Sequence, residues 1–252
     1  MACTNSLAGL RRRYLCWNNA WNIDAQLRYQ PLVELLRTRG VSSLAEVGCG
    51  NTGISGLFAQ DVIGFDLAFE KGIVHVYSPR LHPVIASGSA LPVRDRSFEA
   101  VVCVDALEHI PPPLRGRALR ELLRCTQCWL VFCVPMGAAA ERSDRELLEF
   151  YVAHHGTQPF WLTEHLEYGI PTSVEVLRLI DDAVAALGRT VHVESFEHMN
   201  IDTHNVVHRV LMFGHYRFAR LLSLPLAVWV WARRHIRPRA YYRRFYIIEI
   251  LK

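Results

Sequence analysis

An apolar run passes into a glycine-rich turn at Leu44-Ala45-Glu46-Val47-Gly48-Cys49-Gly50-Asn51-Thr52-Gly53. A helix-like segment near 53–60 follows, and a second apolar run over 62–66 ends in Asp66. A strand, a tight turn, a helix and a strand in this order let a ligand approach bare backbone, and an acid at the end of the second strand can bind ribose hydroxyls. The stretch therefore predicts a nucleotide-type site in an α/β fold.

Glu46 bears on which ligand the turn accepts. The turn also fits the glycine fingerprint of dinucleotide-binding proteins, so the glycines alone do not select the cofactor. A carboxylate two residues before Gly48 repels a pyrophosphate and suits a ligand with positive charge near the turn. S-adenosyl-L-methionine carries an ammonium group, a sulfonium and a ribose but no phosphate, and we expect it as the cofactor. An NAD-dependent oxidoreductase and a non-catalytic cofactor-binding protein are the alternatives of a different class.

The pattern of apolar runs predicts a Rossmann-like α/β fold. Five segments that are largely apolar throughout read as strands: 44–48, 62–66, 83–86, 98–104 and 128–134. Between and before them lie helical segments at 24–39, 53–60 and 114–125. Buried strands separated by helices indicate a mostly parallel sheet with helices on both faces. Residues 190–196 and 244–251 alternate more, and we expect them to complete seven strands as an antiparallel C-terminal pair.

Composition describes one globular domain over residues 1–252. Hydrophobic residues make up 51% and charged residues 21%, with a net charge of +4. The seven cysteines show no framework spacing, and the lone pair Cys125 and Cys128 reads as two core thiols rather than a zinc site. No apolar run follows the N-terminal arginines or reaches the roughly eighteen residues of a membrane span. We therefore expect a cytoplasmic protein.

Further motifs follow the turn in order. Residues 82–102 contain Ser87-Gly88-Ser89-Ala90-Leu91-Pro92 and then Ser97-Phe98-Glu99-Ala100-Val101, and residues 102–111 continue with Asp105-Ala106-Leu107-Glu108-His109. From about Leu44 to Pro135 the chain resembles the class I S-adenosylmethionine-dependent methyltransferases, in their small-molecule, glycan and lipid branch. Residues 243–248 resemble the terminal strand of that family. This resemblance implies a methyltransferase fold and activity.

Carried over residue by residue, the resemblance implies a set of cofactor-binding positions. Glu46 and the glycines would meet the aminoacyl end of the donor, Asp66 the ribose, and Ser89 the edge of the adenine. The full set is Glu46, Gly48, Cys49, Gly50, Asp66, Leu67, Ser89, Ala90, Asp105 and Ala106. The family usually has Asp where this chain has Ser87, which weakens the adenine assignment.

The acceptor side offers histidines as bases. His109 follows the fourth strand directly, and His154 and His155 precede Glu164–Pro171, which resembles methyltransferases of polysaccharide and cell-surface glycan biosynthesis. These three are the expected catalytic residues, with His165 as a further candidate. Asp105-x-x-Glu108-His109 also resembles the metal signature of ubiquinone-pathway O-methyltransferases. Because metal-free relatives carry Glu-His here, we expect no metal.

The chain divides into four functional segments. We expect an N-terminal helical cap (1–40), a cofactor-binding core (41–135), an acceptor-side lid (136–189) and a basic, apolar helical insertion (202–240). The tryptophans and arginines around 221–244 predict peripheral contact with a membrane surface rather than with nucleic acid. The expected reaction is O-methylation of a sugar, lipid or cell-envelope-related metabolite. A soluble natural-product or quinone-type O-methyltransferase is the alternative, and the oligomeric state is open.

Overall fold

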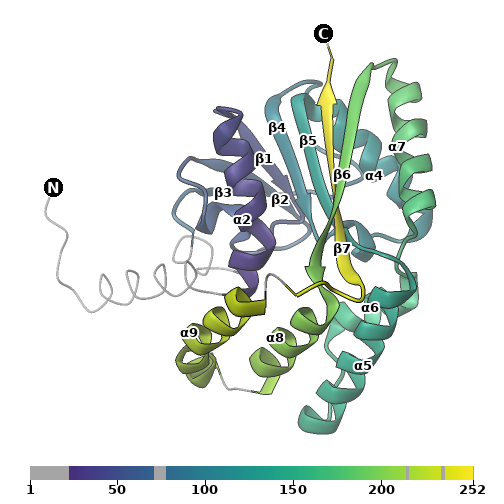
Figure 1. The fold of residues 1–252 in the computed structure, drawn as a ribbon. Helices are drawn as coiled ribbons and strands as arrows, with labels where there is room; N and C mark the ends of the chain where they lie inside the picture. The colour runs from purple at the N-terminus through teal and green to yellow at the C-terminus, as the bar shows by residue number, and fades with distance from the viewer. Residues whose placement is uncertain (1–22, 71–77, 214–215, 234–235, 252) are drawn as a thin grey trace, which may run out of the picture.

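The computed structural model describes residues 23–70, 78–213, 216–233 and 236–251 (Figure 1). Within the last helix the side chains before Pro225 are outside this description. Residues 1–22, about half of the expected N-terminal helical cap, also lie outside the described part of the chain.

A seven-stranded sheet forms the centre of the protein, in the order β3-β2-β1-β4-β5-β7-β6. Its strands are β1 (Leu44–Val47), β2 (Val62–Asp66), β3 (Leu81–Ile85), β4 (Phe98–Val104), β5 (Thr126–Pro135), β6 (Val191–Asn200) and β7 (Tyr241–Ile250). β1 to β5 pair in parallel, whereas β7 runs antiparallel to both β5 and β6. The expected Rossmann-like sheet with an antiparallel C-terminal pair is confirmed.

Helices cover both faces of the sheet. On one face α2 (Ile23–Thr38) buries Leu32 and Leu36 against β4 and β5 residues such as Val131. On the other face α4 (Pro112–Cys125) and α7 (Ser173–Leu187) contribute residues such as Leu119 and Ile180 to a second core cluster. α7 falls in the segment expected as a lid, yet it packs in the core beside α4. Two apolar faces buried in this way account for the sheet's largely continuous apolar strands.

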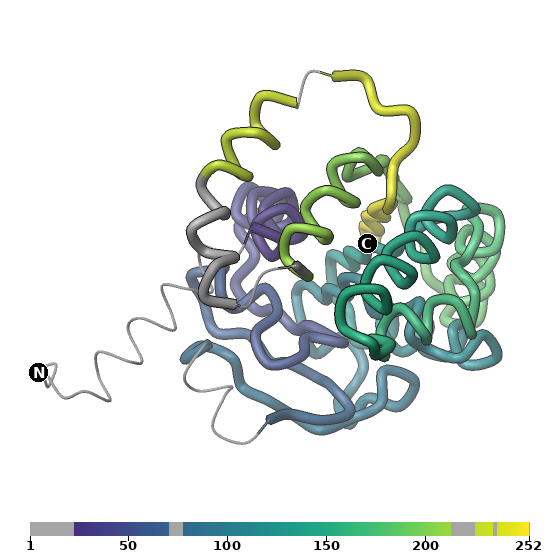
Figure 2. Tube along the Cα trace, turned by 90° about the horizontal axis from the view of Figure 1, so that it is seen from below, coloured from purple at the N-terminus to yellow at the C-terminus, as the bar shows by residue number. Residues whose placement is uncertain are grey.

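Four further helices gather at the end of the sheet where the parallel strands finish (Figures 1 and 2). They are α5 (Gly137–His155), α6 (Phe160–Tyr168), α8 (Ile201–Phe213) and α9 (Tyr216–Arg233). The last two cover most of the segment 202–240, whose described residues 236–240 are not helical. None of the helices in the described part of the chain is long and apolar enough to cross a membrane.

The helix predicted near 53–60 is wrong in extent. The structure has only a short 3₁₀ helix, η1 (Gly53–Gly56), before the chain turns toward β2. Glycine at both ends of this segment disfavours a longer helix, because glycine loses the most backbone freedom there. The late strands are also displaced from 190–196 and 244–251: they span 191–200 and 241–250.

A buried arginine joins the loop after β4 to α6. Arg115 of α4 is 2% exposed, and its guanidinium donates to the carbonyls of Glu108 (3.2 Å), Ile110 (3.0 Å) and Gly169 (2.8 Å). These bonds hold the short helix η2 (Leu107–His109) against the end of α6. Charged hydrogen bonds of this kind are worth about 1.5–3 kcal/mol each. The placement of His109 beside α6 follows from this contact.

Candidate functional site

The glycine turn lies against the end of β4. The Gly48 amide donates to the Phe65 carbonyl at 2.8 Å, which ties the end of β1 to β2. Gly48 has a φ of +75°, and a Cβ at this position would lie 2.3 Å from the Cβ of Ala106. Both the backbone conformation and the close approach therefore require glycine. The turn consequently exposes bare backbone beside the tip of β4.

Glu46 supports the turn from below. Its side chain is fully buried, and its Oε2 accepts a hydrogen bond from the Ile54 amide at 2.7 Å. Oε1 is buried and accepts no hydrogen bond from the described residues. Burial raises the pKa of Glu46 to about 7, and the Ile54 amide opposes that rise. Tyr29 of α2 also opposes the rise, so Glu46 interacts with both the turn and α2.

Asp66 lies at the end of β2, as the sequence predicts. Its Oδ2 accepts a hydrogen bond from the Gly50 amide at 2.8 Å, so it also holds the turn. The next residue, Leu67, is 73% exposed. A large apolar side chain so exposed beside a carboxylate is a candidate wall for a flat, apolar ligand group.

The loop after β3 lies next to Asp66. The Ala86 amide donates to the Asp66 carbonyl at 2.9 Å, and a tight turn follows in which the Ala90 amide donates to the Ser87 carbonyl at 2.9 Å. The hydroxyls of Ser87 and Ser89 lie 2.9 Å apart. Ser89 is buried and Ala90 is exposed. The two predicted adenine-side residues therefore occupy one turn beside the predicted ribose acid.

A cavity of about 250 Å³ lies between the glycine turn and α2. Of the predicted cofactor residues, Gly48, Cys49, Gly50 and Asp105 line it, whereas the other six do not. Sequence reasoning missed the residues that α2 adds, namely Ala25, Arg28 and Tyr29.

Two arginines meet Asp105 at the tip of β4. Arg243 of β7 is 2% exposed and donates to Oδ2 of Asp105 at 2.5 Å. Arg28 lies 3.8 Å from the same oxygen and 2.7 Å from Asp24. The other oxygen of Asp105 is buried and accepts no hydrogen bond among the described residues, and the Nε of Arg28 likewise has no acceptor there. The cavity wall thus offers both an anion and a cation.

The backbone at Asp105 is held in an uncommon conformation. Its φ is +48°, in the left-handed region that aspartate enters more readily than most residues. Such conformations persist where the surroundings enforce them and are frequent at functional sites. Here the two arginines supply that constraint.

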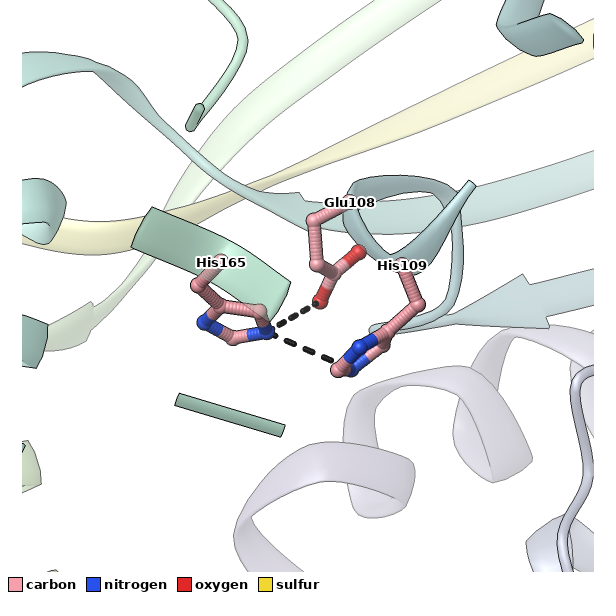
Figure 3. A group of neighbouring side chains, drawn as sticks. All are labelled: Glu108, His109 and His165. Atoms are coloured by element: carbon pink, nitrogen blue, oxygen red, sulfur yellow. Dashed lines mark hydrogen bonds and ion pairs between the residues drawn. The ribbon is translucent and has the colours of Figure 1, made fainter. Parts of the chain in front are cut away.

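His109 lies on η2, four residues after Asp105, and contacts α6. Its Nδ1 is 2.8 Å from Oε2 of Glu164, and its Nε2 is 3.2 Å from Nε2 of His165 (Figure 3). The His165 Nδ1 is 2.8 Å from Oδ2 of Asp144. Burial and the neighbouring His165 ring lower the pKa of His109 below its usual value, while Glu164 opposes the shift.

Glu108 completes this histidine cluster. The carboxylate is fully buried, and burial raises the pKa of Glu108 well above its usual value. One ligand atom from each of Glu108, His109 and His165 lies within 4.8 Å of the others. Asp105, the first residue of the resembled metal signature, is bound to arginine instead. His165, the further candidate from the sequence, joins this cluster because α6 packs against η2.

His154 and His155 lie apart from this cluster, at the exposed C-terminal end of α5. The ring nitrogen of His154 lies 2.7 Å from the Phe150 carbonyl within the same helix, and that of His155 lies 2.8 Å from the Met212 carbonyl of α8. Neither residue lines the cavity. Cys49, which does line it, has a thiol whose pKa is raised by burial.

Comparison with known proteins agrees with this geometry. Residues 45–128 match the model of the methyltransferase domain family. No curated protein sequence matches the chain.

Three solved structures share the fold. Magnesium protoporphyrin IX methyltransferase (ChlM) from Synechocystis PCC 6803, with bound S-adenosylhomocysteine, is 11% identical, covers 99% of this chain and 90% of its own, and has a TM-score of 0.50. The methyltransferase domain of bacterial CtHen1-C is 13% identical, with coverages of 90% and 98% and a TM-score of 0.51. The [4+2]-cyclase SpnF is 16% identical, with coverages of 88% and 80% and a TM-score of 0.50.

At these identities the three structures establish the fold, and the family model establishes the type of domain. The glycine turn, the acid after β2 and the sheet order occur together in the matched segment and its surroundings. Residues 45–128 therefore match the methyltransferase domain family, and the chain as a whole has the Rossmann-like fold of S-adenosylmethionine-dependent methyltransferases.

Proposed function

We propose that the protein transfers the methyl group of S-adenosylmethionine to an oxygen of a sugar, a lipid or a cell-envelope-related metabolite. The observation that supports S-adenosylmethionine as the methyl donor is the cavity between the glycine turn and α2. Arg28 and Asp105 place opposite charges in this cavity. An amino-acid group carries the same two charges. In the transfer the sulfur–methyl bond breaks, an oxygen–methyl bond forms, and the acceptor hydroxyl loses its proton.

The unsatisfied atoms around the cavity fit the aminoacyl end of the donor. We assign the donor's carboxylate to Arg28, whose Nε has no acceptor among the described residues. We assign its ammonium group to Asp105, which has one unsatisfied oxygen, with the charge of Glu46 close behind the turn. Buried polar atoms without partners are costly, and a ligand that pairs them recovers that cost.

The rest of the donor extends toward β2 and β3 in this proposal. Asp66 takes the ribose hydroxyls, and Leu67 packs on the adenine, since its side chain is 73% exposed in the free protein. Ser89 and Ala90 border the adenine from the neighbouring turn. Gly48, Cys49, Gly50 and Ala106 provide the close backbone contact.

On the acceptor side we retain His109, because it follows Asp105 by one turn of chain and lies among polar groups of α6. We assign no role to His154 and His155. Support for an envelope-related acceptor comes from α9 and the segment after it, where Val228 and Trp231 are each 58% exposed and Ile236 is 49% exposed. Arg237 and Arg239 are exposed nearby, and this combination suits contact with an anionic membrane surface.

The acceptor proposal predicts where a labelled methyl group goes. Incubation with methyl-labelled S-adenosylmethionine and isolated membranes should place label in O-methyl ethers of the sugar or lipid fraction. The double variant Val228→Ser, Trp231→Ser should lower this transfer by about threefold or more, because apolar insertion adds to membrane affinity. Val174→Ser, at a position of α7 that is 78% exposed, is the control. Label confined to protein, RNA or soluble small molecules would contradict the proposal.

The assignment of Asp66 predicts a loss of donor affinity. Asp66→Asn keeps an oxygen for the Gly50 amide but removes the charge that accepts from the ribose hydroxyls. We expect calorimetry with S-adenosylhomocysteine to show binding weaker by about 1–3 kcal/mol, or roughly 5- to 150-fold. Asp61→Asn, an exposed acid just before β2, should bind like the parent protein. Equal affinity in Asp66→Asn would remove Asp66 from the site.

The raised pKa of Glu46 predicts a pH-dependent response to ligand. The folded-state pKa of about 7 exceeds the ordinary 4.5, so the stability that Glu46 contributes is full below pH 4.5 and is lost as the pH rises through 7. A nearby ammonium group favours the ionised carboxylate. S-adenosylhomocysteine should therefore raise Tm more at about pH 8 than at about pH 6, and binding at the lower pH should release protons.

Two results bear on this prediction. Glu46→Gln keeps an acceptor for the Ile54 amide and should make the ligand-induced Tm shift independent of pH. A parent protein that is stabilised equally at both pH values would show that Glu46 does not sense the bound ligand.

A further inference from the structure

His109 and His165 face each other through the same type of ring nitrogen. Their Nε2 atoms lie 3.2 Å apart, and each Nδ1 lies 2.8 Å from a carboxylate oxygen, of Glu164 and Asp144 respectively. An ionised carboxylate can only accept, so each Nδ1 carries the proton and donates it. In the neutral imidazoles both facing Nε2 atoms then present lone pairs. Two lone pairs directed at each other repel unless a cation lies between them.

Glu108 adds a third unsatisfied ligand atom to the same space. Its side chain has no exposed area, and neither of its oxygens accepts a hydrogen bond from the described residues. Oε1 lies 3.8 Å from the Nε2 of His165 (Figure 3). A buried carboxylate without donors is among the most costly arrangements in a protein.

The charges around the cluster are also unbalanced. Glu108, Asp144 and Glu164 are three carboxylates, and in the described part of the chain their ion-pair partners within 4 Å are these two histidines. With both rings neutral, Asp144 and Glu164 leave the cluster with an excess of negative charge even when Glu108 is protonated. A bound divalent cation would balance this charge. It would also coordinate the Glu108 oxygen and the Nε2 atoms of both histidines.

We propose that Glu108, His109 and His165 form a binding site for a divalent first-row transition-metal ion, with Zn²⁺ as the reference ion. Two imidazoles and one carboxylate are typical ligands of zinc and of non-haem iron, whereas Mg²⁺ and Ca²⁺ prefer oxygen alone. Tetrahedral zinc with bonds of about 2.0–2.1 Å places two nitrogens about 3.3 Å apart. The observed separation of 3.2 Å matches this geometry.

The surroundings are built as an outer shell for such an ion. Each proposed histidine ligand donates its other N–H to a carboxylate, which fixes the tautomer and the ring orientation. Asp144 is itself held by the Tyr242 hydroxyl at 2.8 Å. Arg115 fixes η2 and the end of α6 through backbone carbonyls, so the three ligands are positioned before an ion arrives.

The site lies on the acceptor side of the donor cavity, because Asp105 lines that cavity and precedes Glu108 by three residues. This step rests on the proposed function: the substrate class that suits the metal site is a hydroxyl compound. A hydroxyl oxygen can occupy an open position on the ion, and metal coordination lowers the pKa of a hydroxyl so that its proton leaves more readily.

The test uses the full, untagged chain after dialysis against a chelator. Calorimetry and elemental analysis with Zn²⁺ should show one bound ion per chain, Mn²⁺ should bind more weakly, and Mg²⁺ should bind weakest of the three. Substitution with Co²⁺ should give visible ligand-field bands that report nitrogen and oxygen ligation. His165→Ala and Glu108→Gln should each lower Zn²⁺ affinity by more than tenfold, and Asp144→Asn by about 10- to 100-fold. His192→Ala, an exposed histidine of β6, is the matched control.

Three results would overturn the site. The first is a parent protein that takes up no Zn²⁺ and shows no Co²⁺ bands. The second is a Zn²⁺ affinity that is unchanged in His165→Ala. The third is a loss of Zn²⁺ affinity in His192→Ala equal to that in His165→Ala. A proton shared by the two rings would then explain their contact. Binding of S-adenosylhomocysteine is measured separately on the metal-free protein, so a failed donor site and a failed metal site give different results. The Co²⁺ spectrum of the parent protein keeps the test valid if a variant does not fold.

Discussion

The fully buried carboxylate of Glu46, which accepts the Ile54 amide at 2.7 Å, is the contact on which the donor side of the molecule depends. It sets the path of the chain immediately after β1, where a Cβ on Gly53 would lie 2.0 Å from the same carboxylate. The turn can therefore pass so close only because glycine occupies that position. Removing the carboxylate would leave the amide of a buried 3₁₀ turn without its acceptor.

A second constraint joins segments far apart in the sequence. Arg28 from α2 and Arg243 from β7 both approach Asp105 at the tip of β4. Burying guanidinium groups is costly unless they are paired, so the position of α2 is coupled to the end of the chain through one carboxylate. The wall of the cavity thus combines residues of the matched family domain with residues of α2, which lies outside that domain.

Much of the fold follows from the sequence, because apolar strands separated by helices and a glycine turn after the first strand leave few arrangements of the chain. The 53–60 helix was wrong in extent because glycine at both ends of the 3₁₀ helix Gly53–Gly56 disfavours a longer helix. The proposed cofactor positions on the turn and at the end of β2 can be located from the sequence, since the local spacing places them. Arg28 and His165 cannot, because their roles depend on how α2 and α6 pack against distant segments. Arg115, which holds the end of α6 against η2, belongs to no sequence motif from which this contact could be predicted.

The structure also changes what the acidic motif after β4 implies. In the metal signature that the sequence resembles, Asp105 stands with Glu108 and His109, but here it is bound by arginines, and His165 of α6 lies beside the other two. The motif therefore divides between two sites: its first residue faces the donor cavity, and its last two face α6. A methyl donor and an acceptor must meet at such a boundary, because in-line transfer requires the two to be aligned.

The measurement that tests the donor cavity most directly is calorimetric titration of the purified full chain with S-adenosylhomocysteine and, separately, with NAD. The charges of Arg28, Asp105 and Glu46 around the turn predict binding of one S-adenosylhomocysteine per chain and no measurable binding of NAD, whose pyrophosphate the carboxylates repel. Binding of NAD without S-adenosylhomocysteine would contradict the account.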